Sequence, residues 1–177
     1  MSHQVTYNDE VLSLADDAME EGYMAQSIVV GTPYADKFTI QRSSKNISMT
    51  ILYSVPNLEF EEEIMQIDNF LSLLQVPIQG YLIFDRPLQG AQKLQKKLKI
   101  MQVVYDNHNE FGAWYGTKII DGSLADSLCK SLFLISKDGA VFYVDLPHDM
   151  SDKINLERLH IALNKAFTIY TGVGCHG

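Results

Sequence analysis

Apolar and polar residues alternate near the N-terminus of the chain, and this period predicts strands. The alternation from Gln4 to Leu14 is broken by Asn8-Asp9, a pair typical of tight hairpin turns, so the sequence predicts a β-hairpin here. A second turn signal, over residues 136–139, predicts another hairpin. Further strands are predicted at residues 27–30, 38–40, 47–54, 80–84, 102–105, 131–135 and 140–146.

Elsewhere the apolar residues recur every three or four positions, which is typical of amphipathic helices. One such helix is predicted over residues 61–74, with three glutamates in its first turn, where the helix dipole favours negative charge. A closing helix is predicted over residues 155–170, ended by Gly172. Shorter helices are predicted at residues 90–98 and 109–116.

The order of these elements predicts one α/β domain. Strands that alternate with helices pair in parallel, and the second hairpin adds antiparallel strands to the same sheet. The order resembles a thioredoxin-like fold, with a central mixed β-sheet flanked by helices. We expect a single domain over residues 1–177, with residues 1–26 as an N-terminal hairpin extension and residues 172–177 as a C-terminal tail.

Composition excludes several classes of protein. The 177 residues are 46% hydrophobic, which is typical of a globular chain with a sizeable core. The net charge of −8 argues against a nucleic-acid partner, because phosphate binding needs clustered basic side chains. No apolar run is long enough to cross a membrane, and the first residues do not form a signal peptide. We therefore expect a cytoplasmic protein.

Several motifs, in the right order, resemble the bacterial thiol peroxidases, which are atypical two-cysteine peroxiredoxins. The resemblance covers nearly the whole chain. It is carried by the N-terminal hairpin, by Gly22-Tyr23-Met24-Ala25, by Asp85-Arg86-Pro87-Leu88, by Phe111-Gly112 with Tyr115-Gly116, and by Asp121-Gly122-Ser123-Leu124.

The resemblance also implies where an active site would lie, and there the chain departs from the pattern. The family motif runs from a proline, through a threonine, to the cysteine that attacks peroxide. In this register Pro56 is kept, but Phe60 replaces the threonine and Glu63 the cysteine. Lys130 stands in place of an arginine, and the resolving cysteine aligns at or near Leu94. No cysteine occurs before Cys129, so no shift of register restores one.

Glu63 has two interpretations. It is either a solvated first-turn acid like its neighbours Glu61 and Glu62, or a permanent anion paired with Lys130 in place of the family's thiolate. Of the two, we expect the solvated acid.

The remaining thiols and histidines are the other candidate chemistry. Cys129 and Cys175 are possible redox thiols, although Cys129 has the pattern of an inert buried thiol and Cys175 that of a tail residue. Cys175-His176 could also bind a metal, but it lacks ligand spacing, as do His108, His148 and His160. We expect no cofactor and no metal.

The resemblance implies a homodimer. Trp114 and Tyr115 are the candidate interface residues, whereas a core position is expected for Phe111. A helix face carrying four lysines is expected to be solvated; these are Lys93, Lys96, Lys97 and Lys99.

Three hypotheses for function follow. The first is a thiol-peroxidase-like protein without peroxidase activity, acting as a binding or regulatory module, either as a homodimer or with an active relative or another protein partner. The second is an oxidoreductase that reduces peroxide through Cys129 or Cys175. The third is a small-molecule pocket beside Phe60 and Glu63.

Overall fold

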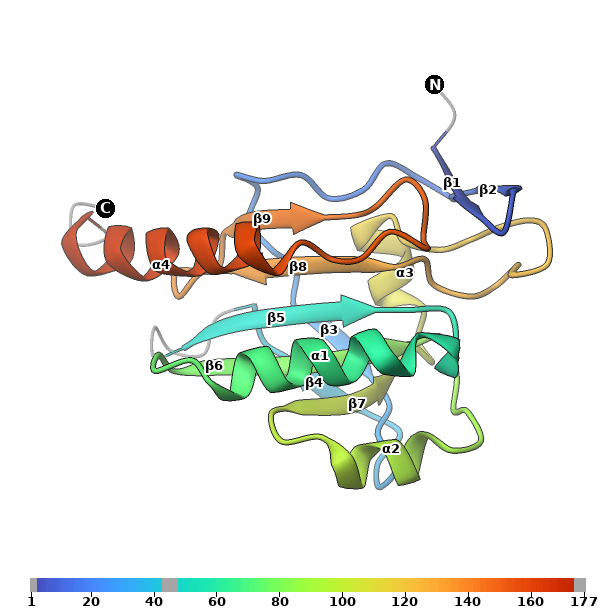
Figure 1. Ribbon diagram of the computed structural model, residues 1–177, viewed down its shortest axis with the longest axis horizontal. Coiled ribbons are helices and arrows are strands. Elements are labelled where there is room, and N and C mark those ends of the chain that lie inside the picture. The colour runs from blue at the N-terminus through green and yellow to red at the C-terminus, as the bar shows by residue number, and fades with distance from the viewer. Residues whose placement is uncertain (1–2, 43–47, 174–177) are drawn as a thin grey trace.

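A five-stranded mixed sheet forms the centre of the computed structural model, which describes residues 3–42 and 48–173 (Figure 1). Its strand order is β7-β6-β5-β8-β9; β5, β6 and β7 run parallel, and β8 and β9 pair antiparallel. These strands are β5 (Met49–Ser54), β6 (Ile78–Phe84), β7 (Met101–Tyr105), β8 (Ser131–Ile135) and β9 (Val141–Asp145). The mixed sheet expected from the sequence is confirmed.

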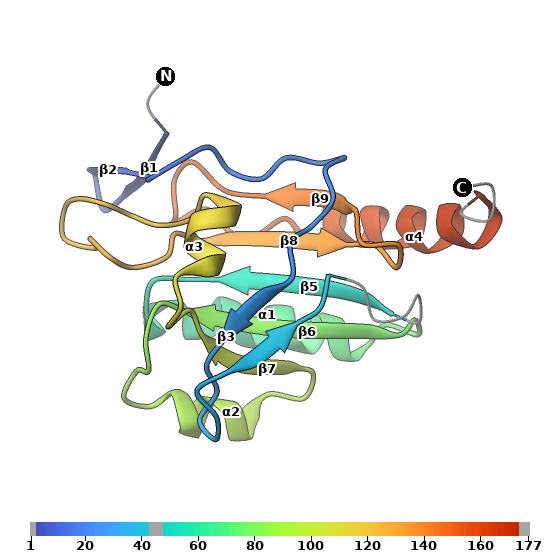
Figure 2. The ribbon, with the colours of Figure 1, turned by 180° about the vertical axis from the view of Figure 1, so that it is seen from behind.

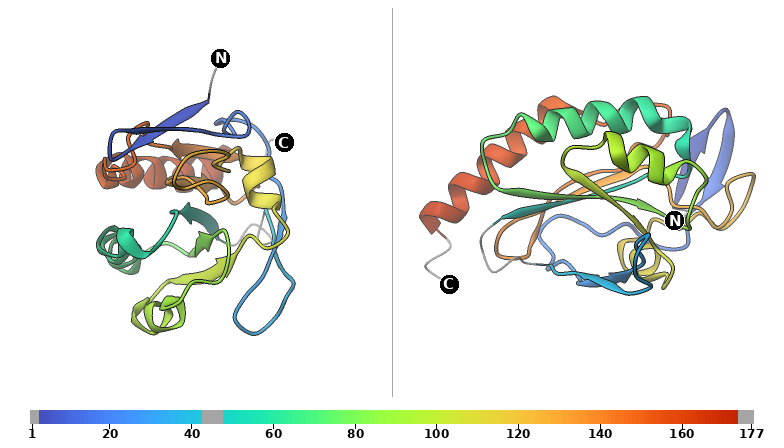
Figure 3. Two further views of the ribbon diagram at one scale, coloured as in Figure 1. Left: turned by 90° about the vertical axis from the view of Figure 1, so that its right-hand side faces the viewer. Right: turned by 90° about the horizontal axis from the view of Figure 1, so that it is seen from below.

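Helices and small sheets cover both faces of this central sheet (Figures 2 and 3). On one face lie the long helices α1 (Glu61–Ser72) and α4 (Leu156–Val173), together with α2 (Ala91–Lys97). On the other face lie α3 (Glu110–Tyr115) and the hairpin of β3 (Ile28–Val30) and β4 (Phe38–Ile40). The N-terminal hairpin pairs β1 (Gln4–Tyr7) with β2 (Glu10–Ser13).

Two hydrophobic clusters hold the layers together, one on each face of the sheet. Alternate residues of a strand point to opposite faces, so Ile51 and Tyr53 join the cluster under α1 and α4, whereas Leu52 joins the cluster under α3. Val5 and Leu12 of the N-terminal hairpin belong to the first cluster, which anchors the hairpin to the main core.

Several boundaries differ from those predicted. The hairpin turn is confirmed, with Asn8 and Asp9 in the left-handed backbone region at φ 51° and 65°. The helix predicted over 61–74 ends at Ser72, and the strand predicted from residue 47 begins at Met49, since Ile47 lies outside the described residues. The prediction that Gly172 ends the last helix is wrong, because α4 continues to Val173; one glycine weakens a helix but need not end it.

Candidate functional site

The candidate site lies where β5 ends and α1 begins. Buried Pro56 follows the strand, and a single 3-10 turn, η1 (Leu58–Phe60), leads into the helix. The Asn57 side chain accepts a hydrogen bond from the Glu59 N–H at 2.9 Å and so caps this turn. The turn fixes where the first helical residues point.

Glu63 lies inside the protein, at 8% exposure, so the prediction of a solvated acid is wrong. Its Oε1 accepts a hydrogen bond from the Tyr53 hydroxyl at 2.5 Å and forms an ion pair with the Lys130 ammonium at 3.0 Å. Its Oε2 accepts one from the Ile154 N–H at 2.9 Å. Each carboxylate oxygen therefore has a donor, as a buried charge requires.

Helix geometry explains the burial. Glu63 stands three residues after Phe60 and four before Ile67, both buried, so the three side chains share the inward face of the helix. Glu62, one position earlier, is exposed. The same spacing was visible in the sequence, where it distinguishes Glu63 from its acidic neighbours.

Lys130 is the counter-charge, and it is 2% exposed. Besides Glu63, its ammonium donates to the Asp152 carbonyl at 2.9 Å and lies 5.0 Å from the centroid of the Phe60 ring. Its backbone N–H contacts the Met150 sulfur at 3.3 Å. The pairing of Glu63 with Lys130, the second of the two interpretations, is therefore present.

Tyr53 is a member of the site that sequence reasoning missed. It is completely buried in β5, and its pKa is raised well above the usual value, first by burial and then by the adjacent Glu63 charge. The hydroxyl therefore stays protonated and acts as a donor to the carboxylate.

Phe60 closes the site on the side of the N-terminal hairpin. It is 8% exposed, and its ring lies 5.4 Å from that of Tyr7, centroid to centroid. The Tyr7 hydroxyl donates to Glu59 at 3.0 Å, which ties β1 to η1. With Tyr7 on one side and Lys130 on the other, the ring occupies the place where a small-molecule pocket was hypothesised.

The environment of Cys129 opposes thiolate chemistry. Cys129 is fully buried, and burial raises the pKa of its thiol to about 12. The thiol therefore stays protonated near neutral pH, whereas the thiolate is the form that reacts. The ammonium of the adjacent Lys130 is held by Glu63, and Cys175 lies outside the described residues.

The other candidate positions are separated from this site. Leu94, at the expected place of a resolving cysteine, is part of the core. Tyr115 is also fully buried, with its hydroxyl bonded to the Gln26 carbonyl at 2.9 Å, so it cannot offer its ring to a partner as the sequence suggested. Trp114 is 46% exposed and remains available.

The histidines are dispersed. His160 packs edge-on against Phe70, and His108 contacts the Asp36 carbonyl. Within residues 3–42 and 48–173, no three His, Cys, Asp or Glu side chains gather as metal ligands would. No helix in that part of the chain is long and apolar enough to cross a bilayer.

The sheet order, the covering helices and the extra N-terminal hairpin define a thioredoxin-like fold of the peroxiredoxin type. Among solved structures, a peroxiredoxin-like protein from Aquifex aeolicus matches with a TM-score of 0.82 and 17% identity, over 94% of this chain and 98% of that one. A thiol peroxidase from Chromobacterium violaceum matches with a TM-score of 0.80 and 14% identity, over 92% and 96%. The mitochondrial 2-Cys peroxiredoxin of Plasmodium falciparum matches with a TM-score of 0.69 and 14% identity, over 86% and 97%.

No protein-family model and no curated protein matches the chain by sequence. At these low identities the structural likeness shows the fold only. The chemistry has to be inferred from the residues of the site.

Proposed function

We propose that this chain is a thiol-peroxidase-like protein without peroxidase activity, which acts as a binding or regulatory homodimer in the cytoplasm. The observation that carries the proposal is the buried ion pair of Glu63 and Lys130 at the start of α1. Both oxygens of the carboxylate already accept hydrogen bonds from the protein. The pair therefore has a structural role where a peroxidase would keep a reactive group.

A carboxylate also cannot do what a thiolate does. Peroxide reduction by a thiolate transfers one peroxide oxygen to sulfur, which becomes a sulfenic acid that a second thiol later reduces. Glu63 has no comparable oxidised state, and the Leu94 side chain cannot act as a resolving group.

The proposal predicts no turnover of hydrogen peroxide above background with a thioredoxin reducing system. The measurement compares the natural chain with the Cys129→Ser/Cys175→Ser variant, which has no thiol and sets the background rate. Equal rates are the expected result, because the only described thiol is buried and protonated.

A second candidate function, peroxide reduction through Cys129 or Cys175, is tested by the same comparison. Turnover by the natural chain that the double variant loses would overturn the proposal and establish a relocated catalytic thiol. The single variants Cys129→Ser and Cys175→Ser would then identify which sulfur reacts.

A homodimer is the expected assembly, and exposed apolar side chains near α3 and β2 support it. Trp114, Val11 and Ile120 are 46%, 54% and 56% exposed, and the Ile120 N–H bonds to the Ser13 carbonyl two residues from Val11. Large exposed apolar groups are typical of interfaces. A solution mass of two chains is expected by sedimentation, with dissociation caused by Trp114→Glu.

Leu73→Glu is the matched control, since Leu73 is an apolar residue at 73% exposure at the end of α1. It should leave the dimer intact. A natural chain that sediments as a monomer at tens of micromolar concentration, or as a dimer that Trp114→Glu does not weaken, would contradict the proposed assembly.

A further inference from the structure

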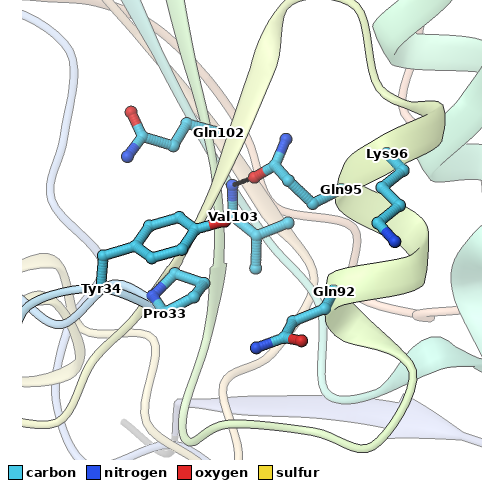
Figure 4. A pocket seen from close by; sticks show the side chains of 7 residues that line it. All are labelled: Pro33, Tyr34, Gln92, Gln95, Lys96, Gln102 and Val103. Atoms are coloured by element: carbon cyan, nitrogen blue, oxygen red, sulfur yellow. Dashed lines mark hydrogen bonds between the residues drawn. The ribbon is translucent and has the colours of Figure 1, made fainter.

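A cavity of about 260 Å³ lies at the outer edge of β7, the last strand of the central sheet, away from the site described above. Figure 4 shows its walls: Pro33 and Tyr34 on one side, α2 on the other, and the strand between them. Seven residues line it; these are Pro33, Tyr34, Gln92, Gln95, Lys96, Gln102 and Val103. Three of these side chains end in a primary amide and one in an ammonium group, and none ends in a carboxylate.

The cavity lies beside the point where the segment from Gly31 onward stops pairing with β7. Gly31 pairs antiparallel with Tyr105, with both backbone hydrogen bonds at 2.8 Å. Two residues further along in that register, Pro33 would stand opposite Val103. Proline has no N–H to donate to the Val103 carbonyl, so the ladder cannot continue there.

A side chain takes the place of the missing strand. Gln95 accepts from the Val103 N–H at 2.6 Å and donates to the Met101 carbonyl at 3.0 Å. These are the bonds that one residue of a neighbouring parallel strand would make with its own N–H and C=O. The amide of Gln95 therefore covers an edge whose backbone groups match an extended chain.

The other lining groups are available to a ligand. The Tyr34 ring is 95% exposed, and the amides of Gln92 and Gln102 and the Lys96 ammonium have no partner among the described residues. α2 and the residues after it carry further lysines in a chain of net charge −8. A local positive charge beside a strand edge favours an acidic peptide over a basic one.

We propose that this edge of β7 binds an acidic peptide segment in extended conformation, which adds as a strand beside Val103. In the complex, one peptide residue takes over both hydrogen bonds of Gln95: its carbonyl accepts from the Val103 N–H, and its N–H donates to the Met101 carbonyl. An acidic side chain pairs with Lys96, and the peptide packs against the ring of Tyr34. This is strand addition, in which main-chain bonds give affinity and side-chain contacts give selectivity. The proposal does not depend on the proposed function.

The test is an NMR titration with the capped peptide Ac-Thr-Glu-Val-Glu-Thr-NH2, read at the backbone amides of β7. We expect saturable shifts centred on Val103 with a Kd below about 1 mM. The same peptide with lysine in place of glutamate should bind at least about tenfold more weakly, because its charges face Lys96. Glutarate, a free dicarboxylate, should not reproduce the shifts.

Matched variants separate this site from general charge attraction. Lys96→Glu should weaken binding of the acidic peptide about tenfold, whereas Lys93→Glu, which is exposed on the same helix but does not line the cavity, should change it little. Gln95→Ala should bind about fivefold more tightly, because the peptide no longer displaces a competing hydrogen bond.

Three results would overturn the proposal. No saturable shifts from the acidic peptide would exclude the site, and equal weakening by Lys93→Glu and Lys96→Glu would reduce it to unspecific attraction. Glutarate binding as tightly as the peptide would identify a small-anion site instead. If Gln95→Ala does not fold, the comparison of the two lysine variants still decides the question.

Discussion

Lys130→Met is expected to lower the free energy of unfolding by about 3–5 kcal/mol, because it leaves the Glu63 charge buried without a counter-charge. Lys130 is 2% exposed, and its ammonium bonds to both Glu63 and the Asp152 carbonyl. A loss of this size is a large fraction of the about 5–15 kcal/mol that stabilises a typical domain. The measurement is equilibrium unfolding in urea, followed by circular dichroism.

The control is Lys97→Met, which removes an ion pair formed with the same helix. The Lys97 Nζ lies 3.7 Å from the Glu61 Oε2, and both side chains are about half exposed. The expected loss in the free energy of unfolding is therefore at most about 1 kcal/mol. Equal losses from the two lysine variants would contradict the structural role assigned to the buried pair.

Removing both charges should restore much of the stability. In Glu63→Gln/Lys130→Met, the amide oxygen can still accept from Tyr53 or from the Ile154 N–H, and no uncompensated charge is left. The cycle of two single variants and one double variant then measures the coupling between Glu63 and Lys130 directly. If the double variant loses as much stability as the two single variants added together, the two side chains act independently.

Much of the fold was predictable because its elements are locally specified. The Asn8-Asp9 turn, the helical period after Phe60 and the hairpin turn at residues 136–139 each depend on neighbouring residues in the chain. The mixed sheet, with parallel strands and an antiparallel hairpin, was inferred from the order of the elements and not from any one residue. Gly172 shows where a local rule failed, since the helix continues through it.

The candidate site was predictable only in part. The resemblance identified positions 56, 60, 63 and 130, but not whether Glu63 faces water or the core. Its partners are distant in sequence: Ile154 is 91 residues away and Tyr53 is on another element. Such contacts depend on how the layers pack, and no spacing rule within one segment reveals them.

Asp68→Ala is expected to lower the free energy of unfolding by about 3–4 kcal/mol, because three backbone N–H groups lose the carboxylate that accepts their hydrogen bonds. Asp68 is 1% exposed on α1, and its carboxylate accepts hydrogen bonds from the N–H groups of Lys99, Ile100 and Met101 at 2.7, 3.0 and 2.9 Å. These three bonds tie the helix to the start of β7. Without the carboxylate, the buried N–H of Met101 and the part-buried N–H groups of Lys99 and Ile100 lose their acceptor. Urea unfolding measures the loss.

Two comparisons show whether the bonds to β7 are the cause. Asp68→Asn keeps one oxygen, which can still accept from Ile100 and Met101, so a smaller loss of about 1–2 kcal/mol is expected. Asn69→Ala, at the next and exposed position of the helix, should change stability by no more than about 0.5 kcal/mol. Amide exchange at Met101 should accelerate in Asp68→Ala more than at Leu82 of β6, because the lost bonds hold the beginning of the edge strand. Uniform acceleration in both strands would show that the variant lowers global stability and that these bonds do not hold the edge locally.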